Sequence, residues 1–539
     1  MKPFRININA VLASPRALFF FLVLIFLLNL LALAHKRLTY DEGNHYQYGI
    51  NVLNGDSHRF DDSKMPVSAL NALPKKIWDK IEPHKLAKPF RFLGKMRTGR
   101  YITVIFSLIV GAYIYRWSRK LYGPSAGFFS LFLYTFSPNI LAHSRLITTD
   151  LFAAGTILIA LYYFWKFINQ GGWRRGLTSA IALGLSQLAK YTAVYLYPLF
   201  FVLAVCFQTP VFAASLKEWN FAVVRKKIRS FFVYTFLFLS VSLVLINAGF
   251  LFNRSFTKLG DYQFRSEFFQ KLQSKHPLAE IPVPVPYPYV EGLDLVKYYD
   301  QSGKADFKNY LFGELRKGEG FRGYYFFAYL FKEPIAIQLL FLWALFHFVR
   351  HRRKFSFFRN EAFLLIPLAF FFIYFNFFFR VDLGIRFFIV ALPLIYVFIG
   401  SLFRDWGAFS TRSKMTVAGL AGYLVISVMS YAPHFLSYFN ELVWDRKTAY
   451  KIMADSNLDW GENTWYLEHY TKRHPEAVVD PASPVPGEII VGANDLTGVN
   501  TDPNKYRWLR ENFEPVRHIA YSYLVFNVPK EAMAEISTS

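Results

Sequence analysis

The 539-residue sequence has little of what a soluble protein is built from. Only 18% of its residues are charged, whereas about a quarter is usual in soluble proteins, and 54% are hydrophobic. It contains a single cysteine, Cys206, which excludes an intramolecular disulfide and a zinc site built from several thiolates. It contains no internal repeat and no low-complexity segment. One large soluble core is therefore excluded, and the long apolar runs are the main signal.

Acidic residues are also scarce. The 37 Asp and Glu residues face 61 Lys and Arg residues, which gives a formal net charge of +24. Such an excess can indicate nucleic-acid binding, but the sequence has no nucleic-acid-binding motif. The basic residues instead gather in short segments between apolar runs, as in the cytoplasmic loops of membrane proteins, which also face anionic lipid. The charge therefore predicts membrane lipids as partners and no nucleic acid.

Apolar runs that are long enough, or nearly long enough, to cross a bilayer recur along most of the chain; a span takes about 20 residues. The predicted spans are 17–35, 101–116, 125–141, 150–167, 177–189, 191–207, 231–251, 326–349, 361–379, 386–403 and 414–432. The first run exceeds the apolar core of a usual signal peptide, and many spans follow it, which favours an uncleaved helix. The predicted fold class is mainly α, a polytopic membrane helix bundle of about eleven transmembrane helices.

The loops between these runs predict the orientation of the chain. Every second loop is basic, as is the segment before the first run. Basic loops stay in the cytoplasm, so the N-terminus is predicted inside and, after an odd number of spans, the C-terminus outside. Two external loops are long, 36–100 and 252–325. The sequence then turns polar with short strand-like runs, which predicts a transmembrane domain over 1–432 and a small external α/β domain over 433–539.

Most of the unusual polar residues fall in the predicted external loops. Two adjacent acids, Asp41 and Glu42, lie a few residues after the first apolar run. The others are His143, Arg145 and Asp150 in the second external loop, Lys190 in the third, and Arg380, Asp382 and Arg386 in the fifth. Charged groups at the mouth of a membrane bundle are costly to desolvate and usually have a task. Their convergence on one face predicts a site at the external surface.

These groups suit the transfer of a sugar from a lipid phosphate. A carboxylate must take the proton of the acceptor, and cations must stabilise the departing phosphate. Asp41 is the candidate base. Lys190, Arg145 and Arg386 are candidate phosphate ligands, because Arg grips phosphate with a fork and Lys acts as a point charge. Structural readings stay open: Lys190 could snorkel at a helix end, and each arginine could pair with a nearby acid.

A divalent metal is an open alternative at the first external loop. Asp41, Glu42 and His45 offer oxygen and imidazole ligands, although their spacing is loose. Glu42 could instead lie at a helix N-terminus, where the helix dipole favours a carboxylate. The sequence therefore predicts no certain cofactor.

Short motifs, in a fixed order along the chain, resemble a known family. Tyr40-Asp41-Glu42 looks like the Asp-Glu motif of the protein O-mannosyltransferase and aminoarabinose transferase group. Its members are membrane glycosyltransferases of the C-type fold that use polyprenyl-phosphate sugars. The similar segments that follow are Ser137–Arg145 with Thr149-Asp150, Gly184–Thr192, Gly384–Pro393, and Tyr431–Asn440 with Asp455–Gly461. The last pair looks like a junction found in bacterial members described as phospholipid-carrier-dependent glycosyltransferases.

The resemblance implies roles for individual residues. It implies that Asp41 is the catalytic base and that Lys190 and Arg386 contact the donor phosphate. Asp150 matches an acidic position near the site, and with Glu42 it is a candidate auxiliary acid near the acceptor. The loop 252–325 is too short for the sugar-binding β-trefoil insert of eukaryotic O-mannosyltransferases, and the external tail differs from that of the aminoarabinose transferases. The acceptor is therefore left open as a protein hydroxyl, a lipid or a glycan.

The predicted function is an inverting glycosyltransferase of the bacterial inner membrane. It would move a hexosyl or pentosyl group from a polyprenyl-phosphate sugar to a periplasmic acceptor. The alternative is a transporter or flippase of lipid-linked saccharides, a class that often shows internal repeats and broken helices at the membrane midplane. The lack of repeats and the external position of the charged residues favour the transferase.

Overall fold

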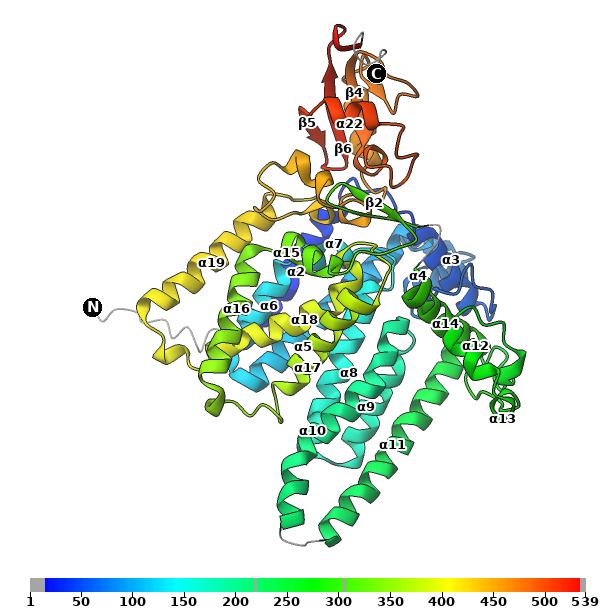
Figure 1. The fold of residues 1–539 in the computed structure, drawn as a ribbon, viewed down its shortest axis with the longest axis vertical. Helices are drawn as coiled ribbons and strands as arrows, with labels where there is room; N and C mark the ends of the chain where they lie inside the picture. The colour runs from blue at the N-terminus through cyan, green and yellow to red at the C-terminus, as the bar shows by residue number, and fades with distance from the viewer. Residues whose placement is uncertain (1–14, 218–220, 304–306, 534–539) are drawn as a thin grey trace.

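The fold was analysed in a computed structural model that describes residues 15–217, 221–303 and 307–533 (Figure 1). The helices up to residue 249 are α2 (Pro15–Leu33), α3 (Glu42–Leu53), α4 (Ser68–Ile81), α5 (Gly99–Tyr122), α6 (Pro124–Thr135), α7 (Pro138–His143), α8 (Asp150–Gln170), α9 (Trp173–Ser186), α10 (Leu196–Lys217) and α11 (Phe221–Gly249). The later helices are α12 (Glu267–Gln273), α13 (His276–Ala279), α14 (Tyr287–Ser302), α15 (Tyr324–Lys332), α16 (Ile335–Arg350), α17 (Ala362–Ile373), α18 (Leu392–Ile399), α19 (Thr411–Met429), α20 (Thr464–Thr471), α21 (Ala493–Leu496) and α22 (Arg507–Asn512). The strands are β1 (Lys308–Leu311), β2 (Glu314–Lys317), β3 (Val478–Val479), β4 (Gly487–Gly492), β5 (Arg517–Ile519) and β6 (Tyr523–Val528).

The bundle is built from helices that are apolar around most of their circumference. Within the described residues, six helices are long and apolar enough to cross a membrane by length and composition. A seventh span results if α15 and α16, which are bent by 112° at their junction, are taken as one. Such helices leave no backbone polar group unpaired in lipid. The predicted mainly α, polytopic membrane fold is confirmed.

The predicted number of about eleven spans is higher than the number of helices that meet this test. The runs that fall short form α6 and α7 (125–141), α9 (177–189), α17 (361–379) and α19 (414–432). The run 125–141 is interrupted where Ser137 caps α7 and Pro138 begins it. Proline has no N–H to continue the preceding helix, so an apolar run does not guarantee one unbroken span.

The chain after α19 carries a four-stranded sheet with the order β3-β4-β6-β5. β4 and β6 pair antiparallel, from Gly487 opposite Val528 to Gly492 opposite Tyr523. Successive side chains of a strand point to opposite faces, so Ile489 joins the main core whereas Ile490 packs in a separate cluster. The predicted α/β character of this part is confirmed, and the boundary at residue 432 stays a prediction.

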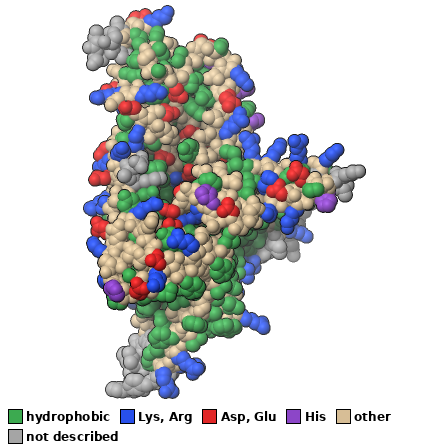
Figure 2. Space-filling model, turned by 90° about the vertical axis from the view of Figure 1, so that its right-hand side faces the viewer, with side chains coloured by type: hydrophobic (Ala, Val, Ile, Leu, Met, Phe, Trp, Pro, Cys, Tyr) green, Lys and Arg blue, Asp and Glu red, His purple; other side chains and the backbone are tan. Residues whose placement is uncertain are grey.

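The two long loops that are predicted to be external lie at the end of the helix bundle nearer the sheet, with β2 below the sheet and α3, α4 and α12 to α14 at the side of the bundle (Figure 1). The first contains α3 and α4, and the second contains α12, α13, α14 and the β1–β2 hairpin. Figure 2 shows one side of the molecule. Apolar side chains cover the lower part of this side, and most of its acidic side chains lie above them. The polar segments thus lie at one end of the bundle, where the functional residues are found.

Candidate active site

A cavity of about 820 Å³ lies where the helix ends, the two external loops and the C-terminal part of the chain meet. Its lining includes Asp41, His45, Lys64, Asp150, Lys190, Tyr191, Arg386, Asp455, Asp459 and Trp460. Five of the residues singled out in the sequence therefore share one cavity: Asp41, His45, Asp150, Lys190 and Arg386. They are contributed by segments far apart in the chain, as the predicted loop pattern requires.

Asp41 and Arg386 are paired at the wall of the cavity. Arg386 Nη1 donates to Asp41 Oδ2 over 3.0 Å, and Arg386 Nε donates to the carbonyl oxygen of Leu383 over 3.1 Å. Asp41 directly precedes α3, and Arg386 lies in the 3-10 segment Ile385–Ala391 that leads into α18. The Asp41 side chain is 33% exposed and that of Arg386 12%. The carboxylate can therefore meet a ligand in the cavity while the guanidinium is held by the protein.

Lys190 and Asp150 form the second acid–base pair of the cavity. Lys190 Nζ donates to Asp150 Oδ1 over 2.6 Å and lies 4.0 Å from the centre of the Phe387 ring. Asp150 is the first residue of α8, where the helix dipole favours a negative charge. Burial lowers the pKa of Lys190, and Arg386 lowers it further, whereas Asp150 opposes the shift. The two cations thus line the same cavity and affect each other electrostatically.

Glu42 lies outside this cavity although it directly follows Asp41. Its carboxylate is buried, accepts from Arg100 Nε over 2.7 Å, and also accepts from the backbone N–H groups of Ile147 and Thr39. Burial alone would raise the pKa of Glu42, but the Arg100 guanidinium and the two amides hold it below its usual value. Glu42 therefore joins the first external loop to α5, instead of facing an acceptor as an auxiliary acid.

Arg145 is also separate from the cavity. Its side chain is fully buried, and its Nε and Nη1 have no hydrogen-bond partner among the described residues. Burial lowers the pKa of Arg145 to about 10, and the nearby Glu462 carboxylate opposes this shift. The phosphate contact predicted for Arg145 is thus not supported by its position, whereas Lys190 and Arg386 both line the cavity.

Asp41, Glu42 and His45 do not form one ligand cluster. The Glu42 carboxylate is engaged by Arg100, and His45 Nδ1 lies 3.5 Å from Ser68 Oγ. Burial, with a smaller effect of Lys64, lowers the pKa of His45 to about 4. Across the described ranges, the side chains spaced to share one metal ion are instead His474, Glu476 and Glu488, in the C-terminal part. A metal held by the predicted trio would require Glu42 to leave Arg100.

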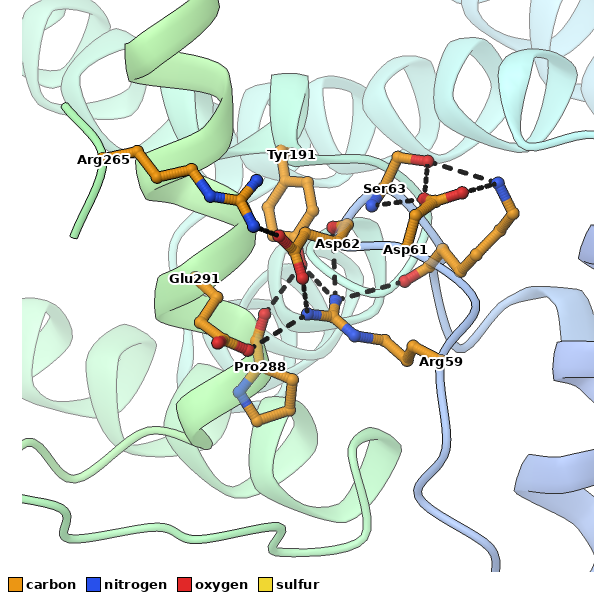
Figure 3. A network of polar contacts seen from close by, with 9 residues as sticks. Arg59, Asp61, Asp62, Ser63, Tyr191, Arg265, Pro288 and Glu291 are labelled. Carbon is orange, nitrogen blue, oxygen red and sulfur yellow. Dashed lines mark hydrogen bonds and ion pairs between the residues drawn. The ribbon is translucent and has the colours of Figure 1, made fainter. Parts of the chain in front are cut away.

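A second polar network lies beside the cavity, around Arg59 (Figure 3). Arg59 Nη1 donates to the hydroxyl of Tyr191 over 3.0 Å. Arg59 Nη2 lies 3.5 Å from Asp62 Oδ1 and 3.7 Å from Glu291 Oε2 of α14. Since Tyr191 follows Lys190 in the chain, this network connects both external loops to the backbone that carries Lys190.

Residues 92–246 match the family described as dolichyl-phosphate-mannose-protein mannosyltransferase. The matched segment contains Arg145, Asp150 and Lys190, so the resemblance drawn from the motifs is confirmed there. The match supports a glycosyltransferase activity for this membrane protein and leaves the sugar open. No curated protein sequence matches the chain.

Several solved structures of membrane glycosyltransferases are similar to this one. ArnT from Cupriavidus metallidurans bound to undecaprenyl phosphate is 11% identical, with a TM-score of 0.47 over 95% of this chain and 98% of that chain. The apo oligosaccharyltransferase of Archaeoglobus fulgidus is 15% identical, with a TM-score of 0.46 over 77% of this chain and 56% of that chain. AglB from the same organism, in complex with an inhibitory peptide and a dolichol-phosphate, is 14% identical, with a TM-score of 0.44 over 85% of this chain and 60% of that chain. At this distance the likenesses assign no residue role here.

The cavity residues of the C-terminal part had no predicted role. Asp455, Asp459 and Trp460 belong to the segment Asp455–Gly461, which carried a motif resemblance and nothing more. The motif was the available sign that these residues belong to the site, because its two acids and its tryptophan lie within six positions of one another. Its place at the cavity depends on how the C-terminal part docks on the bundle, which no local pattern shows.

Asp459→Asn is expected to change how stability depends on pH. Burial, and next the Glu462 carboxylate, raise the pKa of Asp459 to about 7, whereas an unfolded aspartate titrates near 4. Between these values the folded state holds a proton that the unfolded chain has lost, so Asp459 makes the protein less stable as the pH rises from about 4 to 7. The unfolding temperature of the variant, relative to the wild type, should therefore rise across this window.

Thermal unfolding in detergent at pH 4.5, 6 and 7.5 measures this difference. The control is Asp261→Asn, at an exposed aspartate of the second external loop, and its difference from the wild type should not vary with pH. A constant difference for Asp459→Asn over the same range would contradict the assignment of the raised pKa.

Proposed function

We propose that the protein is an inverting glycosyltransferase that takes its sugar from a polyprenyl-phosphate donor at the external face of a bacterial inner membrane. One observation carries the proposal: the cavity holds two acid–base pairs, Asp41 with Arg386 and Asp150 with Lys190. The family match supports the same chemistry, because its members are described as mannosyltransferases that use dolichyl phosphate-mannose. The basic loops of the sequence support a cytoplasmic N-terminus and a periplasmic C-terminus.

In this proposal Arg386 and Lys190 bind the donor phosphate. A phosphate offers more acceptor oxygens than a carboxylate, so it can take over the guanidinium fork from Asp41 and share the ammonium with Asp150. As the bond between the anomeric carbon and the phosphate oxygen breaks, negative charge grows on the phosphate. The two cations stabilise that charge.

Asp41 acts as the general base once the phosphate has engaged Arg386. It takes the proton from an acceptor hydroxyl or amine, and the freed electron pair attacks the anomeric carbon. The attack comes from the side opposite the phosphate, so the new glycosidic bond forms with inverted configuration. The bonding electrons of the old bond leave with the phosphate oxygen. Asp150 holds Lys190 in place throughout.

The alternative is a transporter or flippase of lipid-linked saccharides. The bend of 112° between α15 and α16 favours it, since interrupted helices are common in transporters. An experiment with purified protein in liposomes separates the two functions. Under the transferase proposal, labelled polyprenyl-phosphate sugar yields labelled acceptor with inverted configuration and free polyprenyl phosphate. Movement of the label across the bilayer with no bond cleavage would instead establish transport.

Lys190→Gln is expected to weaken the binding of polyprenyl phosphate by roughly 10- to 100-fold. A hydrogen bond to a charged group contributes about 1.5–3 kcal/mol, and the variant loses both this bond and the positive charge. Titration of the purified protein with a fluorescent polyprenyl phosphate measures the affinity. Asp150→Asn combined with Lys190→Gln restores a neutral pair and should bind as weakly as the single variant.

The matched control is Lys258→Gln. Lys258 is exposed on the second external loop, where it pairs with Glu280 at the surface. Its replacement should leave the affinity unchanged. If Lys190→Gln also bound polyprenyl phosphate as tightly as the wild type, Lys190 would not be a phosphate ligand.

A further inference from the structure

The segment 455–463, here called the strap, links the C-terminal part of the chain to both sides of the cavity. Toward the first external loop, the backbone N–H of Tyr40 donates to the carbonyl oxygen of Trp460 over 3.1 Å. The N–H of Arg37 donates to the carbonyl oxygen of Glu462 over 2.9 Å. Asp41 follows Tyr40 directly, so the strap holds the backbone that presents this carboxylate.

The strap holds the other side of the cavity as well. Ser456 Oγ donates to the carbonyl oxygen of Leu383 over 2.7 Å, and the N–H of Ile385 donates to Asn457 Oδ1 over 3.1 Å. Between them Gly384 has a φ of +78°, and a Cβ built there would lie 2.7 Å from Ser456 Oγ. The loop that carries Arg386 therefore fits against the strap with no room for a side chain at Gly384.

Trp460 contacts Arg386 through its side chain and the residue before Asp41 through its backbone. Its indole lies 4.2 Å from the guanidinium carbon of Arg386, and its carbonyl oxygen holds the residue before Asp41. The tryptophan is 8% exposed and lines the cavity. An aromatic face attracts a cation, most strongly where water is excluded. The guanidinium is thus held at its face by the indole and at Nη1 by the Asp41 carboxylate.

We propose that Trp460 is a positioning residue that orients the Arg386 guanidinium for the donor phosphate. The proposal rests on the proposed function. A guanidinium binds phosphate well only when its fork faces the oxygens, and without the indole Arg386 loses a contact that, together with the bond from Nε to the Leu383 carbonyl oxygen, fixes its orientation. The strap then makes the C-terminal part an integral portion of the active site, and the helix bundle alone would lack the residue that orients this cation.

The experiment is a double-variant cycle on the full-length protein. Trp460→Leu is expected to lower kcat/KM for sugar transfer about tenfold, with most of the loss in KM for the donor. Trp460→Phe keeps an aromatic face and should recover most of this loss. In an Arg386→Gln background, Trp460→Leu should have almost no further effect, because the group on which the indole acts is gone.

A purely structural tryptophan would give a different pattern. Its loss would lower activity by the same factor with or without Arg386, and additive losses in the cycle would overturn the proposal. Trp460→Met, whose unbranched side chain can adapt to the space left by the indole, replaces Trp460→Leu if that variant does not fold. Trp444→Leu is the control, since Trp444 is 94% exposed in the same part of the chain and should have no effect.

Binding of polyprenyl phosphate separates this proposal from the proposed function. If the wild type binds the lipid but transfers no sugar, the transferase assignment fails, and the same cycle read by affinity still tests Trp460. Non-additive losses of affinity would then support its role in orienting Arg386. Additive losses, or none, would overturn it.

Discussion

Asp41→Asn is expected to lower the rate of sugar transfer by about 10²- to 10⁴-fold, the range that a positioned general base contributes. Asparagine has nearly the size of aspartate and can still accept the hydrogen bond from Arg386 Nη1, so the local contacts are retained. It cannot take a proton from the acceptor. The loss should therefore fall on kcat, and the affinity for polyprenyl phosphate should stay within a few-fold of the wild type.

Transfer of labelled sugar under single-turnover conditions measures this effect, and thermal unfolding verifies the fold. The control is Asp79→Asn, at an exposed aspartate of the same external loop that pairs with Lys75. It should retain full activity. Full turnover by folded Asp41→Asn would remove Asp41 from the mechanism and leave Asp459, an acid with a raised pKa on the C-terminal side of the cavity, as the next candidate base.

Glu42→Gln is expected to destabilise the protein by about 3–5 kcal/mol, because it leaves Arg100 with a buried charge that has no ionic partner. Both side chains are almost completely buried, at 0% and 2% exposure. The low pKa of the folded Glu42 means that its stabilising effect is present at neutral pH. It is lost as the pH falls through the folded value, below the pKa near 4 of an unfolded glutamate. Thermal unfolding at pH 7 measures the loss.

The matched control for this variant is Glu468→Gln. Glu468 pairs with Arg37 at the surface, where both side chains are about half exposed, and such pairs contribute little. A Glu42→Gln protein that unfolds at the wild-type temperature but transfers no sugar would contradict the structural role of Glu42. It would support its role as an auxiliary acid near the acceptor. We therefore expect replacement of Asp41 to lower activity and replacement of Glu42 to lower stability.

The helices and the polar end of the molecule follow from local patterns. An apolar run forms a helix in lipid whatever the rest of the chain does, because every backbone group must be paired within the segment. Alternation of basic loops then assigned Asp41, Asp150, Lys190 and Arg386 to one face, and all four line the same cavity. A local pattern does not show where such a run is interrupted, and the run 125–141 forms two short helices because Pro138 begins the second of them.

The sequence by itself determined the helical membrane class, the grouping of the charged residues on one face and the identity of two acids and two cations at the cavity. Only the tertiary structure decided which partner each charge has. Asp41 pairs with a residue 345 positions away, while Glu42, next to it, points to Arg100. Neighbouring side chains at the start of a helix point in different directions, and their contacts depend on how distant segments pack around the helix. The same reason placed Trp460 against Arg386, where no spacing in the sequence could have predicted it.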